Sequence, residues 1–570
     1  MSSLFAELKR RNVFKVAIAY VVAAWLVLQI SDVVLGNIDA PAWVFKVVML
    51  LMALGLPFAL IMAWAFQMTP EGLIRDGKVS GAAAQPGGAG EKLSATVEAV
   101  STRPPADEKS IAVLPFVNMS DQLSNEYFSD GISEELLNLL SKIPELRVAA
   151  RISSFSLKGK ELQIAQVGTI LNVAYILEGS VRKAGNQVRI TAQLIKVNDG
   201  YHLWSENYDR TLDNIFAVQD EIAMAVVEQL KLKLLGKVPT TNETDPQAYA
   251  FFLKGQHLAR QGTAEAWDQA IAMYQKVLAI APTYAAAWAG LGNVYSRQTT
   301  KGLRPFGTGY ALARDAAQKA LALDKDNARA HTTLGWIAMA GTDDLQIAIR
   351  YFDRALELEP ANLDILGYQA DIAGNLGRHD EAIAILEYIA AYDPVNPDVH
   401  HDLGRQYIWA RRLDESIASN RTALRLSPGR VSTNWAIGLA LVLKGEFAAA
   451  LEAMQQEPNT GWRMNGLTMV YHALGRTAES DAALQELIRT EEQAAAYNIA
   501  YLYAFRGEAD MAFAWLDKAV QYKDSGIMEL PSQPLFENIR SDPRWGPFVQ
   551  GIGKSKEQLA RIEFKAKLPS

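Results

Sequence analysis

The chain has 570 residues, of which 49% are hydrophobic, a formal net charge of −7 and no cysteine. At a typical domain size of roughly 150 residues, this length predicts three or four structural units. The absence of cysteine excludes disulfides and thiolate metal sites. The acidic balance argues against general nucleic-acid binding, because replacing the counterions of phosphates requires a basic surface.

Two long apolar stretches near the N-terminus predict a transmembrane helical hairpin in residues 13–68. The first runs from Val16 to Leu35, and the second, from Val47 to Phe66, has 20 residues without a charge. Because a bilayer core takes about 20 helical residues, each stretch is long enough to cross it. The alternatives are a cleaved signal peptide and a buried globular hairpin. The immediate second span disfavours the former, and the lack of a polar face disfavours the latter.

Basic residues near the first apolar stretch predict the orientation of this hairpin. Four Lys and Arg side chains lie in residues 9–15, whereas the connecting residues 36–44 contain neither Lys nor Arg. The positive-inside rule then places both ends of the hairpin in the cytoplasm, including the basic tail 1–12.

A flexible linker is predicted for residues 69–107. Most of it, residues 80–107, is rich in Ala, Gly, Ser and Pro and shows no apolar periodicity. Such a composition is typical of a tether.

Residues 108–237 predict a small α/β domain, because short apolar strands alternate there with amphipathic helices. The expected elements, in chain order, are a buried strand at 111–116, a helix capped by Ser129 or Asp130, a short strand at 147–150, a helix at 164–171, three meander strands with turns at 184–186 and 198–200, and a helix at 214–235. Both turns contain glycine, which tolerates the positive φ of a tight hairpin.

Three stretches of this domain carry a family resemblance: SIAVLPFVNMSDQLSNEYFSDGISEELLNLL, YILEGSVRKAGNQVRITAQLI and GYHLWSENYDRTLDNIFAVQDEIA. They resemble the TolB-N-terminal-like (FlgO-like) domain of bacterial signalling proteins, over residues 110–235. In that family the domain precedes tetratricopeptide repeats and often follows a nucleotide cyclase or a winged-helix module. Residues 81–107 leave no room for either module. The resemblance therefore implies a signalling context without that output module, in a multi-pass protein of the bacterial inner membrane.

After Pro246 the pattern becomes wholly helical and periodic. The closing turns are separated by 43, 35, 34 and 34 residues, and they begin at Ala281, Asp324, Glu359, Asp393 and Ser427. The tetratricopeptide repeat has a period of 34 residues and the motif W-x2-L-G-x2-Y, which residues 288–295 (WAGLGNVY) match. We predict about seven or eight repeats in residues 246–550 and a cap or tail in 551–570. The 43-residue interval predicts a longer loop near residues 299–310.

The predicted fold class is thus α + α/β: a transmembrane helical hairpin, a small TolB-N-like α/β domain and an α-solenoid of repeats. Such arrays bind segments of partner proteins on their concave face. Counting from the repeat motif places seven side chains there: Asn293, Trp336, Asp371, His401, Arg405, Trp435 and Leu439. Their mixed character predicts a partner segment with polar and apolar anchors.

No catalytic signature of the nucleophile-elbow, HExxH or kinase type occurs in the sequence. The helix start at residues 130–135 (DGISEE) carries three acids, which suit the helix dipole but repel a phosphate. His400, His401 and Asp402 are of metal-ligand type, but no third ligand is evident on a facing helix. We expect His400 to pack inward and His401 to face the groove. The sequence predicts no enzyme activity, no cofactor and no metal.

These patterns together predict a membrane-anchored scaffold or adaptor. It would bind protein partners through the repeat groove and the bilayer through residues 13–68, and it would not bind nucleic acid. Two alternatives stay open. One is a periplasmic envelope-assembly factor, since relatives of the α/β domain act outside the cytoplasm. The other is a nucleotide-binding or enzymatic α/β domain.

Overall fold

The structure is a computed structural model with two compact units, Met1–Gly88 and Ala89–Ser570. It describes residues 49, 66–69, 72–75, 108–120, 125–143, 146–160, 162–212, 215–230, 244–360 and 362–568. In the first unit, β1 (Phe66–Thr69) and β2 (Gly72–Arg75) form an antiparallel hairpin.

The predicted membrane spans, 16–35 and 47–66, lie outside the described residues except for Met49 and Phe66. Within the described part of the chain, no helix combines the length and the apolar character needed to cross a bilayer. The start of the predicted linker is wrong, because β2 lies inside residues 69–107. Thr69 of β1 pairs with Gly72 of β2. Residues 80–107 lie outside the described ranges.

The α/β domain is built on a mixed sheet in the order β5-β3-β6-β7-β8, with β4 beside β6. The strands are β3 (Ser110–Val113), β4 (Val117–Asn118), β5 (Arg147–Val148), β6 (Tyr175–Ala184), β7 (Gln187–Lys196) and β8 (His202–Thr211). β3 runs parallel to β5 and β6, and β6, β7 and β8 form an antiparallel meander. Gly185 and Gly200 have φ of 60° and 71°, which confirms the two predicted turns.

Helices cover both faces of this sheet, because successive residues of a strand point in opposite directions. Ile111 and Val113 of β3 join the apolar cluster of α5 (Glu126–Ser141) and α8 (Ile215–Gln229). Ala112, between them, joins the cluster of α7 (Ile164–Leu171) on the other face, near α6 (Arg151–Ser156).

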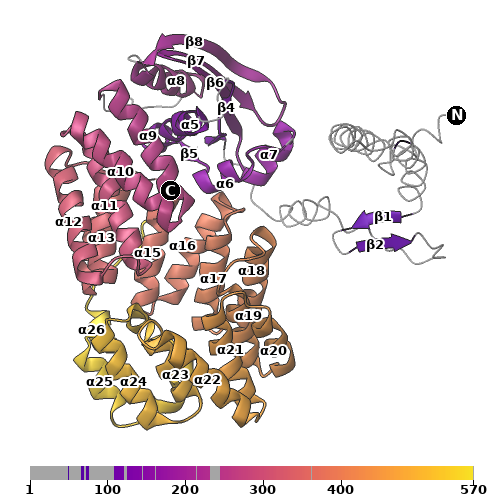
Figure 1. The fold of residues 1–570 in the computed structure, drawn as a ribbon, viewed down its shortest axis with the longest axis vertical. Coiled ribbons are helices and arrows are strands. Elements are labelled where there is room, and N and C mark those ends of the chain that lie inside the picture. Colours follow the sequence, from indigo (N-terminus) through magenta and orange to yellow (C-terminus); the bar gives the residue numbers. More distant parts are fainter. Residues whose placement is uncertain are drawn as a thin grey trace, which may run out of the picture. The chain divides into compact units, whose positions relative to one another are not determined.

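Eight antiparallel helix pairs follow in the described residues (Figure 1). They are α9 (Pro246–Gln261) with α10 (Ala264–Ile280), α11 (Ala285–Thr300) with α12 (Phe306–Leu323), α13 (Ala328–Trp336) and its π-helical continuation η3 (Ile337–Gly341) with α14 (Leu345–Leu358), α15 (Leu363–Asn375) with α16 (His379–Tyr392), α17 (Pro397–Trp409) with α18 (Leu413–Leu426), α19 (Thr433–Lys444) with α20 (Phe447–Gln455), α21 (Thr460–Ala473) with α22 (Thr477–Glu491), and α23 (Ala496–Phe505) with α24 (Ala509–Tyr522).

The loop predicted near residues 299–310 is longer than those within the other described pairs, but by few residues. Five residues, 301–305, separate α11 from α12. Most of the extra residues of the 43-residue interval lengthen the two helices. Thr299 and Thr300 lie in the last turn of α11 and donate their hydroxyls to the carbonyls of Tyr295 and Ser296.

Glycines let the helices of a pair approach closely. A Cβ on Gly335 of α13 would lie 2.6 Å from the ring of Phe352 on α14, and one on Gly404 of α17 would lie 2.2 Å from the amide of Asn420 on α18. These contacts explain why the repeat motif carries glycine at this helix face.

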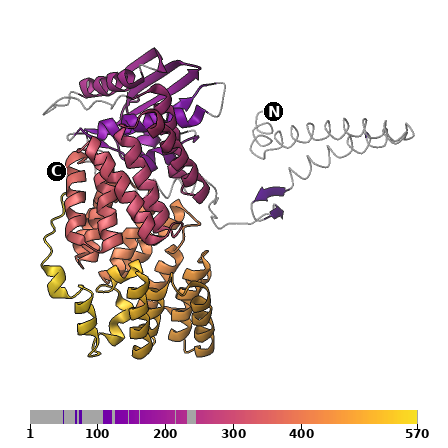
Figure 2. The ribbon, with the colours of Figure 1, turned by 60° about the vertical axis from the view of Figure 1, so that its left-hand side comes forward.

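The chain ends in shorter elements that return to the middle of the array. They are η4 (Ser525–Glu529), η5 (Pro534–Ile539), α25 (Trp545–Gly551) and α26 (Lys556–Ala560). From α26 the segment 561–568 runs back along the middle repeats (Figure 2). Arg378 donates to the carbonyls of Ile562 and Phe564 at 3.0 and 2.8 Å, and the Lys567 ammonium lies 3.1 Å from Asp353.

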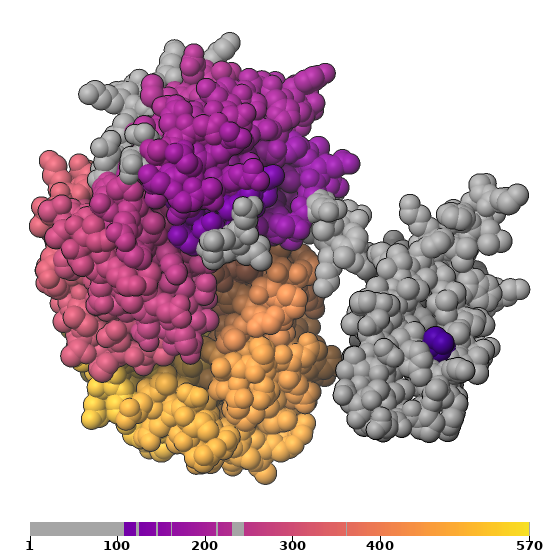
Figure 3. Space-filling model, turned by 45° about the horizontal axis from the view of Figure 1, so that its top comes forward, coloured from indigo at the N-terminus to yellow at the C-terminus, as the bar shows by residue number. Residues whose placement is uncertain are grey.

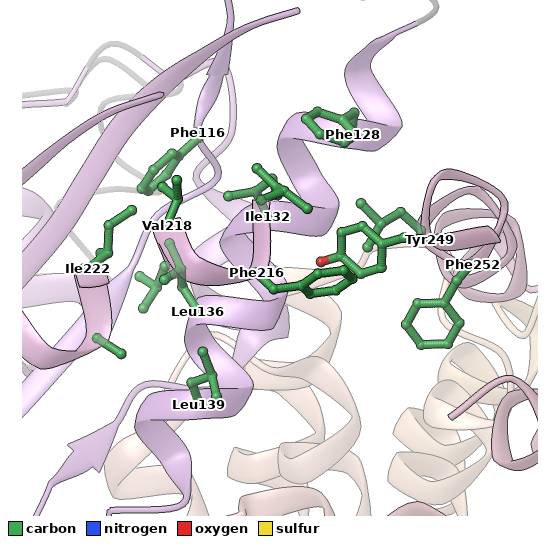
Figure 4. Packing of buried hydrophobic residues seen from close by; sticks show 14 of the residues in the cluster. Phe116, Phe128, Ile132, Leu136, Leu139, Phe216, Val218, Ile222, Tyr249 and Phe252 are labelled. Atoms are coloured by element: carbon green, nitrogen blue, oxygen red, sulfur yellow. The ribbon is translucent and has the colours of Figure 1, made fainter. Parts of the chain in front are cut away.

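One apolar cluster runs from the α/β domain into the first repeats (Figure 4). The rings of Phe216 of α8 and Tyr249 of α9 lie with their centroids 4.5 Å apart and their planes tilted by 57°. A Cβ on Gly131 of α5 would lie 2.8 Å from Leu253 of α9, so α5 and α9 are in close contact. The domain and the first repeat therefore share a core.

The α/β domain also touches the fourth pair of helices. Arg147 Nη1 donates to the hydroxyl of Tyr392, and Ser153 Oγ donates to the carboxylate of Asp393, at the end of α16. Figure 3 shows the domain (purple) against both the first repeats (pink) and the later ones (orange).

We predict that Gly335→Ala lowers the thermal unfolding midpoint of the full chain by a few degrees. The added methyl group would collide with the buried ring of Phe352, and overpacking of this kind costs about 1–3 kcal/mol. Scanning fluorimetry would measure the change. Gly367→Ala in α15 is the matched control, because nothing lies within 4 Å of its added Cβ. An equal response of the two variants would contradict the close approach of α13 and α14.

Candidate functional site

The structure separates the seven predicted groove residues into two groups. Four are half-buried: Asn293, Trp336, Asp371 and Arg405. Three are buried: His401, Trp435 and Leu439. The expectation that these last three face a groove is wrong. It assumed the same geometry in every repeat, but α19 is buried without interruption from Thr433 to Val442, so this stretch leaves no side chain for a partner.

His401 packs between helices instead of facing outward. Gly404, one turn along α17, makes room for Asn420, so this face of α17 meets α18. His401 Nδ1 lies 3.2 Å from both Asn420 Oδ1 and Thr433 Oγ1. Burial lowers the pKa of His401 to about 3, so its ring is neutral. His400, expected to pack inward, is less buried and bonds the Pro394 carbonyl.

Trp435 and Leu439 belong to the core of the later repeats. Trp435 Nε1 donates to Asn465 Oδ1 at 2.8 Å, and its ring centroid lies 4.7 Å from that of Trp462. Across the described ranges, no three His, Cys, Asp or Glu side chains are grouped to hold a metal ion.

Trp336, Asp371 and Arg405 come together on α13, α15 and α17, and they face the C-terminal part of the chain. Arg405 Nη1 donates to Glu529 Oε1 at 3.1 Å, and Asp371 lies 3.6 Å from Arg405 Nη2. Trp336 and Met528 belong to the same apolar cluster. In this structure the short helix η4 therefore occupies the predicted groove with an apolar and an acidic side chain.

Three carboxyl groups surround Arg405: Asp371, Asp402 and Glu529. Burial raises the pKa of all three, while Arg405 acts in the opposite direction. For Asp371, repulsion from Asp402 and Glu529 adds to the effect of burial, and the pKa reaches about 7. The raised pKa values thus reflect three carboxyl groups that share one guanidinium in a poorly solvated place.

The raised pKa predicts a pH-dependent effect of Asp371→Asn. The folded state binds the Asp371 proton more tightly than the unfolded chain, so ionisation costs stability as the pH rises from about 4 to about 7. We expect the variant to melt higher than the wild type at pH 8, with a smaller difference at pH 5. Asp380→Asn, at an exposed position of α16, should show no such trend. A lower unfolding midpoint for Asp371→Asn than for the wild type at pH 8 would contradict the raised pKa of Asp371.

A second site lies where α5 and α6 meet the first repeats. It is a pocket of about 480 Å³, lined also by α9, α10 and α11 and by the starts of α13 and α15. This volume is within the usual range for small-molecule sites. Asn293 is the member of the predicted groove set that lines it.

Four arginines on four helices line this pocket: Arg151, Arg260, Arg297 and Arg329. Arg151 and Arg260 both pair with the buried carboxylate of Glu134. Burial lowers the pKa of Arg260 to about 9, and repulsion from Arg329 and Arg297 adds to this. Burial lowers the pKa of Arg151 to about 10. The pocket thus brings positive charges close together in a poorly solvated place.

The remaining wall of the pocket consists of aromatic side chains and the side-chain amide of Gln256. Phe252 packs edge-on against Tyr284, with centroids 5.2 Å apart, and lies 6.1 Å from the ring of Tyr274. Gln256 is 3% exposed, and its Oε1 has no hydrogen-bond partner among the described residues. Its Nε2 donates to Glu135 at 3.4 Å.

Sequence reasoning did not find these arginines. Arg260 and Arg297 each follow a glycine, Gly255 or Gly292, by five residues, so they hold equivalent positions in the first two repeats. Aligning the repeats for basic residues could have revealed this pair. The sequence did not reveal that α5 and α6 cover the same place.

The start of α5 differs from its prediction. The helix begins at Glu126, so Ser129 and Asp130 lie inside it and are buried, and neither caps it. Phe128 belongs to the core, which explains the earlier start. Burial would raise the pKa of Asp130, but hydrogen bonds with His257 and Lys158 outweigh it and lower the pKa.

Comparison with known families identifies two parts of the chain. Residues 107–225 match the model of the second domain of HilA/YgeH-like transcriptional regulators, and residues 340–397 match a tetratricopeptide repeat model. With eight helix pairs in the described residues, the chain is a tetratricopeptide repeat protein with a small sheet domain. The match of residues 107–225 carries a different family description from the TolB-N-like resemblance, which stays a prediction.

Two curated bacterial proteins are similar to parts of the chain. It is 40% identical over 245 residues to putative adenylate cyclase 3 of Rhizobium meliloti (strain 1021), which covers 41% of each chain. It is 24% identical over 321 residues to the transcriptional regulator HilA of Salmonella typhimurium (strain LT2), which covers 54% of this chain and 55% of the regulator. The chain thus spans about two-fifths to just over half the length of these relatives.

A solved structure of the human IFIT1 dimer with m7Gppp-AAAA is similar at 13% identity, with a TM-score of 0.37. The match covers 54% of this chain and 77% of that one.

Proposed function

We propose that this protein is a non-catalytic adaptor, anchored in the bacterial inner membrane by residues 13–68, that binds a protein partner through the middle of its repeat array. Tetratricopeptide repeats generally bind segments of other proteins. The observation that carries the proposal is the convergence of Trp336, Asp371 and Arg405 on Met528 and Glu529. These side chains already bind an apolar and acidic segment within the chain, and we infer that a partner segment of the same chemistry competes for them.

A regulatory role is part of this proposal. The similarity to putative adenylate cyclase 3 and to the transcriptional regulator HilA supports it, as does the TolB-N-like resemblance. The lack of a recognised catalytic motif supports a chain without enzyme activity. The net charge of −7 supports a protein partner in preference to a nucleic acid.

Cross-linking in intact cells tests the partner site, with adducts of the full chain identified by mass spectrometry. We expect Arg405→Glu to lose adducts and the pair Met528→Ala with Glu529→Gln to gain them, because the first removes the anchor and the second weakens the competing segment. Arg421→Glu, at an exposed position of α18, should leave adducts unchanged. Trp336→Ala is a second test should Arg405→Glu fold poorly. If Arg405→Glu and Trp336→Ala both gave the same adducts as the wild type, this groove would be excluded as the partner site.

Fusions at the C-terminus test the membrane topology. The four basic residues before the first apolar stretch predict a cytoplasmic C-terminus. We therefore expect a green fluorescent protein fusion to fluoresce and an alkaline phosphatase fusion to be inactive. An active phosphatase fusion would favour the periplasmic alternative.

A further inference from the structure

Two of the arginines that line the pocket between the α/β domain and the first repeats form no ion pair within the described residues. Arg151 and Arg260 share Glu134. Arg297 of α11 and Arg329 of α13 also line the pocket, and neither guanidinium group forms an ion pair or a hydrogen bond with the residues that the structure describes. Two guanidinium groups from successive repeats are therefore available to a ligand.

Most carboxylates around the pocket are engaged in their own loops. Asp326 pairs with Arg354 at 2.6 Å, and Glu359 accepts from Asn362 at 2.6 Å. Asp324 accepts from the backbone N–H of Asp326 at 3.1 Å. The charges of Asp130 and Asp364 act on Arg151, and that of Asp364 acts on Arg260.

Glu135 lies on the same wall and accepts hydrogen bonds from Gln256 and Asn138. Burial raises its pKa, while the charge of Arg329 acts in the opposite direction. The guanidinium groups of Arg297 and Arg329 nevertheless form no ion pair with a carboxylate among the described residues.

A buried amide supplies a second, independent indication of a ligand. Gln256 Oε1 lacks a hydrogen-bond partner in the described residues although the side chain is 3% exposed. Burying an acceptor without a donor is costly, so this oxygen calls for an N–H or O–H group inside the pocket. The rings of Tyr274, Tyr284 and Tyr368 line the same space and suit a planar group.

We propose that this pocket binds a small phosphate ester with a planar ring, of the size of a mononucleotide. The phosphate would be held by Arg297 and Arg329, since the guanidinium fork matches phosphate oxygens in pairs. A ring would lie against the tyrosines and donate a hydrogen bond to Gln256. Because the walls come from the α/β domain and from the repeats, the ligand would tie the two together. The proposal does not depend on the partner groove at Arg405.

Isothermal titration calorimetry on the full chain tests this proposal, with AMP, inorganic phosphate and adenosine as probes. We expect saturable binding of AMP and weaker binding of phosphate and adenosine, because each of these supplies half of the contacts. Arg297→Gln with Arg329→Gln should weaken AMP binding at least about tenfold, the usual effect of losing a charge-assisted hydrogen bond. Arg421→Gln is the matched control and should bind as the wild type does.

Each result of these titrations supports or overturns the proposed mononucleotide site. Equal affinity for phosphate and AMP would show an anion site without ring recognition and would overturn the mononucleotide assignment. Binding that survives the double variant, or no saturable binding of any probe, would overturn the site. Arg297→Gln alone, at an exposed position, serves if the double variant has a lowered melting midpoint. Loss of AMP binding with normal cross-linked adducts would separate this site from the adaptor function.

Discussion

The contact between α5 and α9 determines how the residues from 108 onward are arranged. Gly131 has no side chain, and Leu253 fills the space where one would be. The two helices can therefore approach closely enough for the sheet domain and the first repeat to bury one continuous cluster. A Cβ at this position of α5 would lie within 2.8 Å of the Leu253 side chain, so a larger residue would require the two helices or Leu253 to shift. The pocket exists because of this close approach.

The predicted groove and the observed one differ for a physical reason. A repeat array is usually described as a series of equivalent units, each offering the same helix face to a ligand. Here α19 is enclosed by its neighbours, and η4 covers the face of α13, α15 and α17. Access to the middle of the array thus depends on the C-terminal part of the chain. Binding and release in such a protein would follow the position of that segment.

Local patterns predicted the repeats and most of the sheet correctly. The spacing of the turns identified the helix pairs, and the glycines at 185 and 200 identified the hairpins, because these signals depend on a few neighbouring residues. The errors came from long-range contacts. His401 is buried between helices because Gly404 admits Asn420, and α5 began early because Phe128 is needed in the core. The pocket joins residues from 135 to 368, and no local pattern links such distant positions.

In a chain of stacked repeats, small rotations between neighbouring repeats add up along its length. Two sets of contacts between distant parts of the chain restrict such rotations here. The α/β domain spans from α9 to the end of α16, and the segment 561–568 spans from α26 back to α14 and α16. The repeat array cannot lengthen unless one of these two sets of contacts breaks. Force or torsion applied to the sheet domain would then reach the fourth repeat directly, without passing through the three repeats between them.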